Sequence, residues 1–176
     1  MVVESGLEVT VGSLAAGGDG IARHPDGRVV FVPGGLPGEK LRAEITAEAK
    51  GYVRARLVEV VDPSPDRVVP PCCEPARGCG GCQWQHVDVM AQRRLKAGIV
   101  IDALRRIAHA NDPPVDRDVP GVEATGYRTT LHLGVEGGRA SYRRRHGHEM
   151  VAPATCMVAH PMLASMLFGV DFGPET

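Results

Sequence analysis

The chain has 176 residues, of which 43% are hydrophobic, which is enough for one medium-sized domain or two small ones. Its 20 basic and 21 acidic residues leave a net charge of −1, so any contact with nucleic acid must come from local patches rather than a global field. With 22 glycines, 14 prolines and only 4% aromatic residues, the composition favours many turns and a thin core, and the length argues against a complete large two-domain enzyme.

No apolar run in the sequence approaches the roughly 20 residues that a membrane-spanning helix needs. The first ten residues have neither the basic region nor the apolar region of a secretion signal. We therefore expect a cytoplasmic chain whose thiols stay reduced, so that a tight group of cysteines indicates metal binding before a disulfide.

The first third of the chain has the period-two alternation of β-strands. Leu7–Val11 and Leu41–Ala47 alternate apolar and polar side chains, which buries one face of a strand and exposes the other. Asp26-Gly27 predicts a hairpin turn, and the last strand, Tyr52–Val61, slips its alternation at Leu57-Val58, which predicts a bulge. About five short strands in this part favour a small closed barrel, because closure removes exposed edges.

The remainder of the chain predicts a linker, a helix and a second β-rich part. Prolines between positions 63 and 71 mark the linker, and Ala91–His109 predicts a helix because its apolar residues share one stripe. Asn111-Asp112-Pro113-Pro114 is expected to end this helix. The elements expected beyond about Val122 are a hairpin joined at Glu136-Gly137-Gly138, a short strand and a short helix: Tyr127–Val135, Arg139–Arg144, His148–Val151 and Pro161–Phe168.

The cysteines are the most informative residues of the sequence. They are Cys72, Cys73, Cys79, Cys82 and Cys156, so that four of the five fall within eleven residues. Gly80-Gly81, between two of them, lets the backbone fold tightly around a bound group. A zinc ribbon would supply a second C-x-x-C or a histidine pair, which this sequence lacks at the right spacing. One upstream cysteine, Cys72 or Cys73, and a remote fourth therefore favour a [4Fe–4S] cluster over zinc or a structural or redox pair.

Two sets of residues carry a resemblance to a known family. The motif C-x5-C-G-G-C-x-x-Q-H is matched by Cys73, Cys79, Gly80, Gly81, Cys82, Gln85 and His86. Four phrases typical of a TRAM domain are Gly17–Ala22, Val30–Gly34, Leu36–Glu39 and Pro63–Arg67. From about Leu7 to Leu167 the chain thus resembles the amino-terminal half of the TRAM-domain RNA uracil-5-methyltransferases, which use S-adenosylmethionine.

The resemblance implies a fold class, a cluster and an RNA partner. The fold is expected to be mainly β with some α: a small OB-like RNA-binding barrel at 1–62, a linker with the cysteine motif at 63–90, a helix at 91–112 and an incomplete β-rich RNA-binding domain at 113–176. The implied ligands of the [4Fe–4S] cluster are Cys73, Cys79, Cys82 and Cys156, because the family's five-residue spacer selects Cys73 over Cys72. The proline usual after the fourth ligand is Met157 here.

The family's chemistry belongs to a downstream domain that binds S-adenosylmethionine and carries the nucleophilic cysteine and an acidic base. This sequence has no glycine-rich cofactor-binding turn, so no catalytic residue is assigned. We expect the chain, as a fragment or truncated product, to bind RNA, with rRNA favoured over tRNA, and not to methylate it by itself. The alternatives are a stand-alone non-catalytic RNA-binding module with an iron–sulfur or zinc site, and an iron–sulfur electron carrier, which does not need an RNA-type barrel.

Two groups of basic and aromatic residues are candidates for RNA contacts. They are Lys50, Tyr52, Arg54 and Arg56 near the last barrel strand, and Arg143, Arg144 and Arg145 after the second hairpin. Basic and aromatic side chains together can hold phosphates and stack on bases. The alternative for each group is an ordinary solvated surface.

Overall fold

The computed structural model describes residues 6–117, 121, 123–145 and 147–173. The chain forms two compact units. The first unit comprises the described residues of 1–69 and 86–119, and the second those of 70–85 and 120–176. The cysteine loop, residues 70–85, therefore belongs to the second unit, although the segments before and after it belong to the first.

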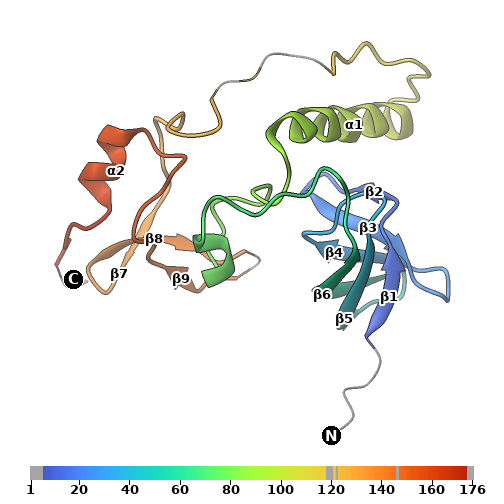
Figure 1. Ribbon diagram of the computed structural model, residues 1–176, viewed down its shortest axis with the longest axis horizontal. Coiled ribbons are helices and arrows are strands. Elements are labelled where there is room, and N and C mark those ends of the chain that lie inside the picture. Colours follow the sequence, from blue (N-terminus) through green and yellow to red (C-terminus); the bar gives the residue numbers. More distant parts are fainter. Residues whose placement is uncertain (1–5, 118–120, 122, 146, 174–176) are drawn as a thin grey trace, which may run out of the picture. The chain divides into compact units, whose positions relative to one another are not determined.

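The first unit is built on a curled sheet whose strand order is β1-β5-β6-β4-β3-β2 (Figure 1). Its strands are β1 (Leu7–Thr10), β2 (Ser13–Leu14), β3 (Asp19–Arg23), β4 (Val29–Pro33), β5 (Lys40–Glu48) and β6 (Tyr52–Asp62). The two edge strands, β1 and β2, are the halves of one bent segment interrupted only by Val11-Gly12. Because β1 pairs with β5 and β2 pairs with β3, this segment connects the two edges of the sheet. The expected mainly β, OB-like fold is confirmed.

The alternation of apolar residues produces the core of the sheet. The inward side chains are nearly inaccessible, and they are Val9, Val11, Ala22, Val30, Val32, Leu41, Ala43, Val53 and Ala55. The expected hairpin is present: β3 and β4 pair around Asp26-Gly27, and Gly27 takes a φ of 92°, which favours glycine. The expected bulge is present too, because Ala43 pairs with Leu57 and Arg42 with Glu59, which leaves Val58 unpaired in the ladder.

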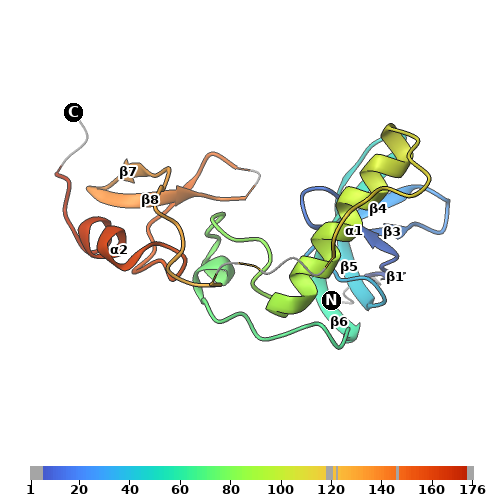
Figure 2. The ribbon, with the colours of Figure 1, turned by 90° about the horizontal axis from the view of Figure 1, so that it is seen from above.

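The helix of the first unit, α1 (Val89–Ile107), lies beside the sheet of the same unit (Figure 2). It begins two residues earlier than expected because the Asp88 carboxylate accepts hydrogen bonds from the amides of Met90 (2.9 Å) and Ala91 (3.1 Å). It ends at Ile107, before the prolines, where His109 adopts a positive φ of 53°. Neither helix in the described part of the chain has the length and apolar character that crossing a bilayer demands.

The second unit combines a three-stranded sheet, β7 (Gly134–Glu136), β8 (Arg139–Arg143) and β9 (Met150–Val151), with the single turn η1 (Glu74–Arg77) and the helix α2 (Pro161–Leu167). The predicted hairpin is confirmed, but its first strand is much shorter than Tyr127–Val135. The reason is that the chain around Arg128 pairs elsewhere: the Arg128 amide donates to the carbonyl of Val158, and the His160 amide donates to the carbonyl of Arg128.

Candidate metal centre and nucleic-acid surface

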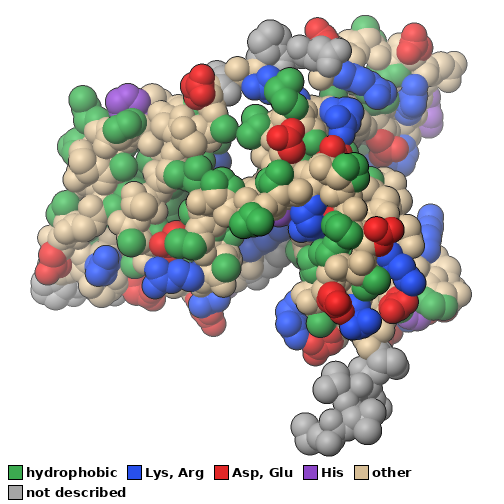
Figure 3. All heavy atoms as spheres, in the orientation of Figure 1, with side chains coloured by type: hydrophobic (Ala, Val, Ile, Leu, Met, Phe, Trp, Pro, Cys, Tyr) green, Lys and Arg blue, Asp and Glu red, His purple; other side chains and the backbone are tan. Residues whose placement is uncertain are grey.

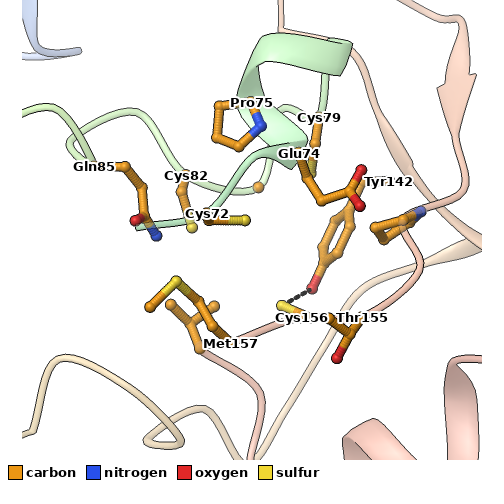
Figure 4. Close-up of a pocket in the computed structure, with 13 residues that line it drawn as sticks. Cys72, Glu74, Pro75, Cys79, Cys82, Gln85, Tyr142, Thr155, Cys156 and Met157 are labelled. Carbon is orange, nitrogen blue, oxygen red and sulfur yellow. Dashed lines mark hydrogen bonds between the residues drawn. The ribbon is translucent and has the colours of Figure 1, made fainter. Parts of the chain in front are cut away.

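Four cysteine thiols of the second unit line one cavity. They are Cys72, Cys79, Cys82 and Cys156, and Figure 4 shows their side chains together with Tyr142 and Met157. Three come from the loop at 70–85, and Cys156 comes from the segment between β9 and α2. The walls are formed largely by apolar atoms, including those of Pro75 and Val158. A soft, largely apolar cage of this kind suits a metal or cluster that prefers thiolate ligands.

The loop that carries these cysteines is anchored by its backbone and by one buried carboxylate. The η1 turn places Glu74 in the interior, where its Oε1 accepts a hydrogen bond from the Ala154 amide at 3.3 Å. The amide of Cys79 donates to the carbonyl of Glu74 (3.0 Å), and the amide of Gly80 donates to the carbonyl of Arg143 (3.1 Å). The cysteine motif is thereby docked on the end of β8, close to the Cys156 segment.

Gly80 is required by this docking. A Cβ at position 80 would lie 2.4 Å from the carbonyl oxygen of Arg143, which is backbone and cannot move aside as a side chain can. We expect Gly80→Ala to destabilise the second unit by about 1–3 kcal/mol, the usual cost of overpacking. The measurement is thermal unfolding together with protease cleavage in the loop. Gly98→Ala is the control, since a Cβ there meets nothing within 4 Å; equal effects of the two variants would contradict the docking argument.

Tyr142 makes a polar contact with the remote cysteine, Cys156. Its hydroxyl lies 3.4 Å from Sγ of Cys156, as the dashed line in Figure 4 shows, and its ring stacks on Phe168 with centroids 6.4 Å apart. Burial, and next the contact with Cys156, raise the pKa of Tyr142, so its hydroxyl stays protonated and can donate to a thiolate. Arg128 also approaches the site, donating from Nη1 to the Gly81 carbonyl at 3.4 Å.

Two of the thiols are held in a setting that disfavours their charged form when nothing neutralises it. Burial raises the pKa of both Cys72 and Cys79, and the nearby thiols of Cys82 and Cys156 raise that of Cys79 further. A cationic centre bound among the sulfurs would remove this penalty. The chemistry of the donor set therefore fits a thiolate-ligated metal group.

Three of the four predicted ligands line the cavity, and the fourth does not. Cys79, Cys82 and Cys156 line the cavity, whereas Cys73 is exposed and precedes the η1 turn as its N-cap residue. The thiol that joins the other three is that of Cys72. Within the described residues, no three His, Cys, Asp or Glu side chains are grouped tightly enough to hold a single metal ion.

The predicted RNA-binding residues of the first unit differ in what they contact. Tyr52 is exposed on β6, and the Arg54 guanidinium carbon lies 5.8 Å from its ring centroid and 5.7 Å from that of Phe31. Arg56 instead forms a close ion pair with Glu44 of β5. Lys50 lies in the turn between β5 and β6. Basic and acidic side chains intermingle over this sheet in Figure 3, so its arginines do not form a uniformly positive surface.

The second predicted basic group lies next to the cysteine loop. Arg143 ends β8, and its carbonyl accepts the Gly80 amide described above. Arg144 forms an isolated β-bridge with Cys79 and an ion pair with Glu149 at 3.0 Å. Arg145 follows in the turn and is partly buried. Any RNA contact made by this group would therefore be coupled to the conformation of the cysteine loop.

One buried cluster of charged and polar groups was not predicted from the sequence, although its residues lie in the TRAM-like phrases given above. Glu39 is fully buried, and its carboxylate pairs with Arg67 at 2.5 and 2.7 Å. The same carboxylate accepts hydrogen bonds from the amides of Leu36 (2.8 Å) and Ser64 (3.2 Å). The sequence does hold a signal for this pair. Glu39 ends a turn rich in glycine and proline, and Arg67 lies in the proline-rich linker, so each is a charged residue beside a turn. The linker is thus fastened to the sheet.

Comparison with known proteins agrees with this architecture. Residues 3–58 match the TRAM domain. An uncharacterized RNA methyltransferase of Streptomyces avermitilis is 38% identical over 173 residues, covering 90% of this chain and 40% of that protein. The 23S rRNA (uracil(1939)-C(5))-methyltransferase RlmD of Halomonas elongata is 35% identical over 169 residues, covering 93% of this chain and 34% of that protein. The chain therefore spans about two fifths of the length of these relatives or less.

A solved structure supports the fold over nearly the whole chain. The tRNA (uracil-54, C5)-methyltransferase of Pyrococcus abyssi, crystallised with S-adenosyl-L-homocysteine, superposes with a TM-score of 0.63 at 21% identity. The match covers 91% of this chain and 34% of that one. The chain therefore carries a TRAM domain, and over 90–93% of its own length it is similar to RNA methyltransferases.

Proposed function

We propose that this chain forms the RNA-binding and [4Fe–4S]-binding portion of an RNA uracil-5-methyltransferase, with rRNA as its substrate. The observation that carries the proposal is the convergence of four thiols on one cavity in a chain whose relatives are RNA methyltransferases. The choice of rRNA rests on the 35% identity to the RlmD relative, whereas the tRNA enzyme supports the fold alone.

The arrangement of the sulfurs supports a cluster rather than a zinc ion. A tetrahedral zinc with Zn–S bonds of about 2.3 Å would bring its sulfurs to about 3.8 Å from one another. The described residues provide no such compact group, although four thiols line the cavity. An iron–sulfur cluster is larger and is held by four more widely spaced thiolates. Cys79, Cys82, Cys156 and one thiol of the Cys72-Cys73 pair are its proposed ligands.

The proposed role of the cluster is to connect distant parts of the chain. Cys82 and Cys156 are 74 positions apart, and a common bound group would restrict the unfolded chain while fixing the loop against β8. S-adenosylmethionine is the proposed methyl donor of the complete enzyme, and the target uracil would be turned out of its stack for reaction. The proposed compartment is the cytoplasm, where five free cysteines stay reduced.

The RNA-binding half of the proposal is tested by affinity measurements at several salt concentrations. We expect the chain to bind single-stranded or looped rRNA segments with an affinity that falls as salt rises, because phosphate contacts release counterions. The protein should be purified without oxygen so that the cysteine loop keeps its bound group. Absent binding, or binding that does not respond to salt, would contradict the proposal.

A further inference from the structure

The outer face of β3, β4 and β6 is unusually apolar for a strand surface that meets solvent. Ile21 of β3 lies opposite Phe31 of β4, and Val29 of β4 lies opposite Tyr52 of β6. These side chains point away from the core, which the alternate residues of the same strands fill. Phe31 is partly exposed, and Tyr52 is 41% exposed. Large apolar side chains that cluster on an otherwise charged surface indicate a binding site.

The aromatic side chains of this face are arranged with a cation. The rings of Phe31 and Tyr52 meet edge to face with centroids 5.9 Å apart, and Arg54 reaches over both. Arg54 is directed by Asp19, whose Oδ2 lies 3.9 Å from its Nη1, yet 47% of the Arg54 side chain remains accessible. Two flat rings and a flat guanidinium are thus held side by side on a rigid sheet.

The arginines beside this face contact aromatic rings and backbone as well as an acidic side chain. On β5 and the far part of β6, the basic side chains face acidic partners: Arg42 contacts Glu59, and Arg56 contacts Glu44. Beside the aromatic pair, Arg54 packs on rings as well as meeting Asp19, and Arg23 at the end of β3 donates to the backbone carbonyl of Gly27. Two arginines therefore flank an apolar centre, which is complementary to a base with its adjoining phosphates.

We propose that Phe31, Tyr52 and Arg54 form a stacking site for one unpaired nucleobase of RNA. The inference rests on the proposed RNA binding and adds to it the kind of contact and the residues that make it. The base stacks on the exposed aromatic surface, Arg54 covers its edge or its phosphate, and the contact is independent of base identity because every base has a stacking face. A base paired in a duplex cannot enter, so the site selects single-stranded segments.

The test uses the full chain, prepared without oxygen, and a single-stranded RNA of about ten nucleotides that contains one 2-aminopurine. Tyr52→Leu and Phe31→Leu are each expected to weaken binding about 5- to 150-fold, the value of one lost stack, and to reduce the quenching of 2-aminopurine fluorescence. The slope of the logarithm of the binding constant against the logarithm of salt concentration should stay unchanged in both variants. Arg54→Gln should reduce the magnitude of that slope by about one unit. The duplex of the same sequence should respond to none of the aromatic substitutions.

Phe172→Leu is the matched control, since Phe172 is similarly exposed (45%) but lies in the second unit, outside the proposed site. Circular dichroism of each variant checks that the sheet remains folded. If the wild-type chain binds RNA and the folded Tyr52→Leu and Phe31→Leu variants bind it equally well, the stacking site is refuted while RNA binding stands. If the wild-type chain binds no RNA, both proposals fail together.

Discussion

Replacing Glu39 with alanine is expected to lower the free energy of unfolding of the first unit by about 3–5 kcal/mol. The carboxylate is fully buried and is the only charge that Arg67 meets among its described contacts. Its removal would leave that guanidinium, which is largely buried itself, without compensation, and would orphan the amides of Leu36 and Ser64. Denaturant unfolding followed by circular dichroism measures the loss.

The control for this prediction is a surface ion pair on the same sheet. Glu59 pairs with Arg42, and both side chains are about half exposed, so Glu59→Ala should cost about 0–1 kcal/mol. Similar losses for Glu39→Ala and Glu59→Ala would show that the buried pair does not hold the linker to the sheet.

The Glu39 pair also predicts a dependence on pH. Burial raises the pKa of Glu39, but hydrogen bonds from Arg67 and from the Leu36 and Ser64 amides outweigh it and bring the pKa below its ordinary value of 4.5. A lowered pKa in the folded state contributes stability above pH 4.5, and this contribution is lost as the pH falls through the folded-state value. Unfolding curves between pH 7 and pH 3 should therefore show a decline that Glu39→Gln reduces. An unchanged decline in that variant would contradict the assignment.

Replacing Cys156 with serine is expected to abolish the bound iron of the anaerobically purified chain. Cys156 is the sole ligand candidate from outside the loop at 70–85 and lies in the cavity with three other thiols. Its loss would leave one corner of the cluster without a thiolate and would remove the connection between the loop and the segment before α2. Iron content and visible absorption measure the effect. Retention of full iron in this variant would exclude Cys156 as a ligand.

The adjacent cysteines provide a matched pair of variants for the remaining ligand. Cys72 lines the cavity and Cys73 is exposed, so the geometry predicts that Cys72→Ser loses iron and that Cys73→Ser keeps it. The motif spacing predicts the reverse. Iron retained by Cys72→Ser and lost by Cys73→Ser would show that the chain before η1 shifts by one residue when the cluster is assembled.

Much of the secondary structure of the first unit could be predicted because its strands have one solvent-exposed face and one buried face. The alternation from Leu41 to Ala47 and the turn at Asp26-Gly27 specify strands and a hairpin locally, and the slip at Leu57-Val58 specifies the bulge. The sequence predicts the start of α1 two residues too late, because Asp88 caps the helix through a side-chain contact that hydrophobic spacing does not reveal.

Features that depend on long-range contacts could not be predicted. The Glu39–Arg67 pair joins positions 28 residues apart, and the Tyr142–Cys156 contact joins β8 to the segment before α2. Tyr127–Val135 has a strand-like composition, but pairing of Arg128 with the chain near Ala159 replaces most of the strand. The motif spacing selects Cys73, Cys79, Cys82 and Cys156, of which the last three line the cavity. The thiol of Cys72 lines it in place of Cys73, whose side chain is exposed, because side-chain direction cannot be derived from spacing.

The central claim is that the thiol-lined cavity holds a [4Fe–4S] cluster in an RNA-binding portion of a methyltransferase. The direct measurement is iron, zinc and acid-labile sulfide in the wild-type chain purified without oxygen, together with its visible absorption before and after dithionite. We predict about four iron and four sulfide per chain and a broad absorption that bleaches on reduction. Stoichiometric zinc without iron or sulfide would contradict the claim.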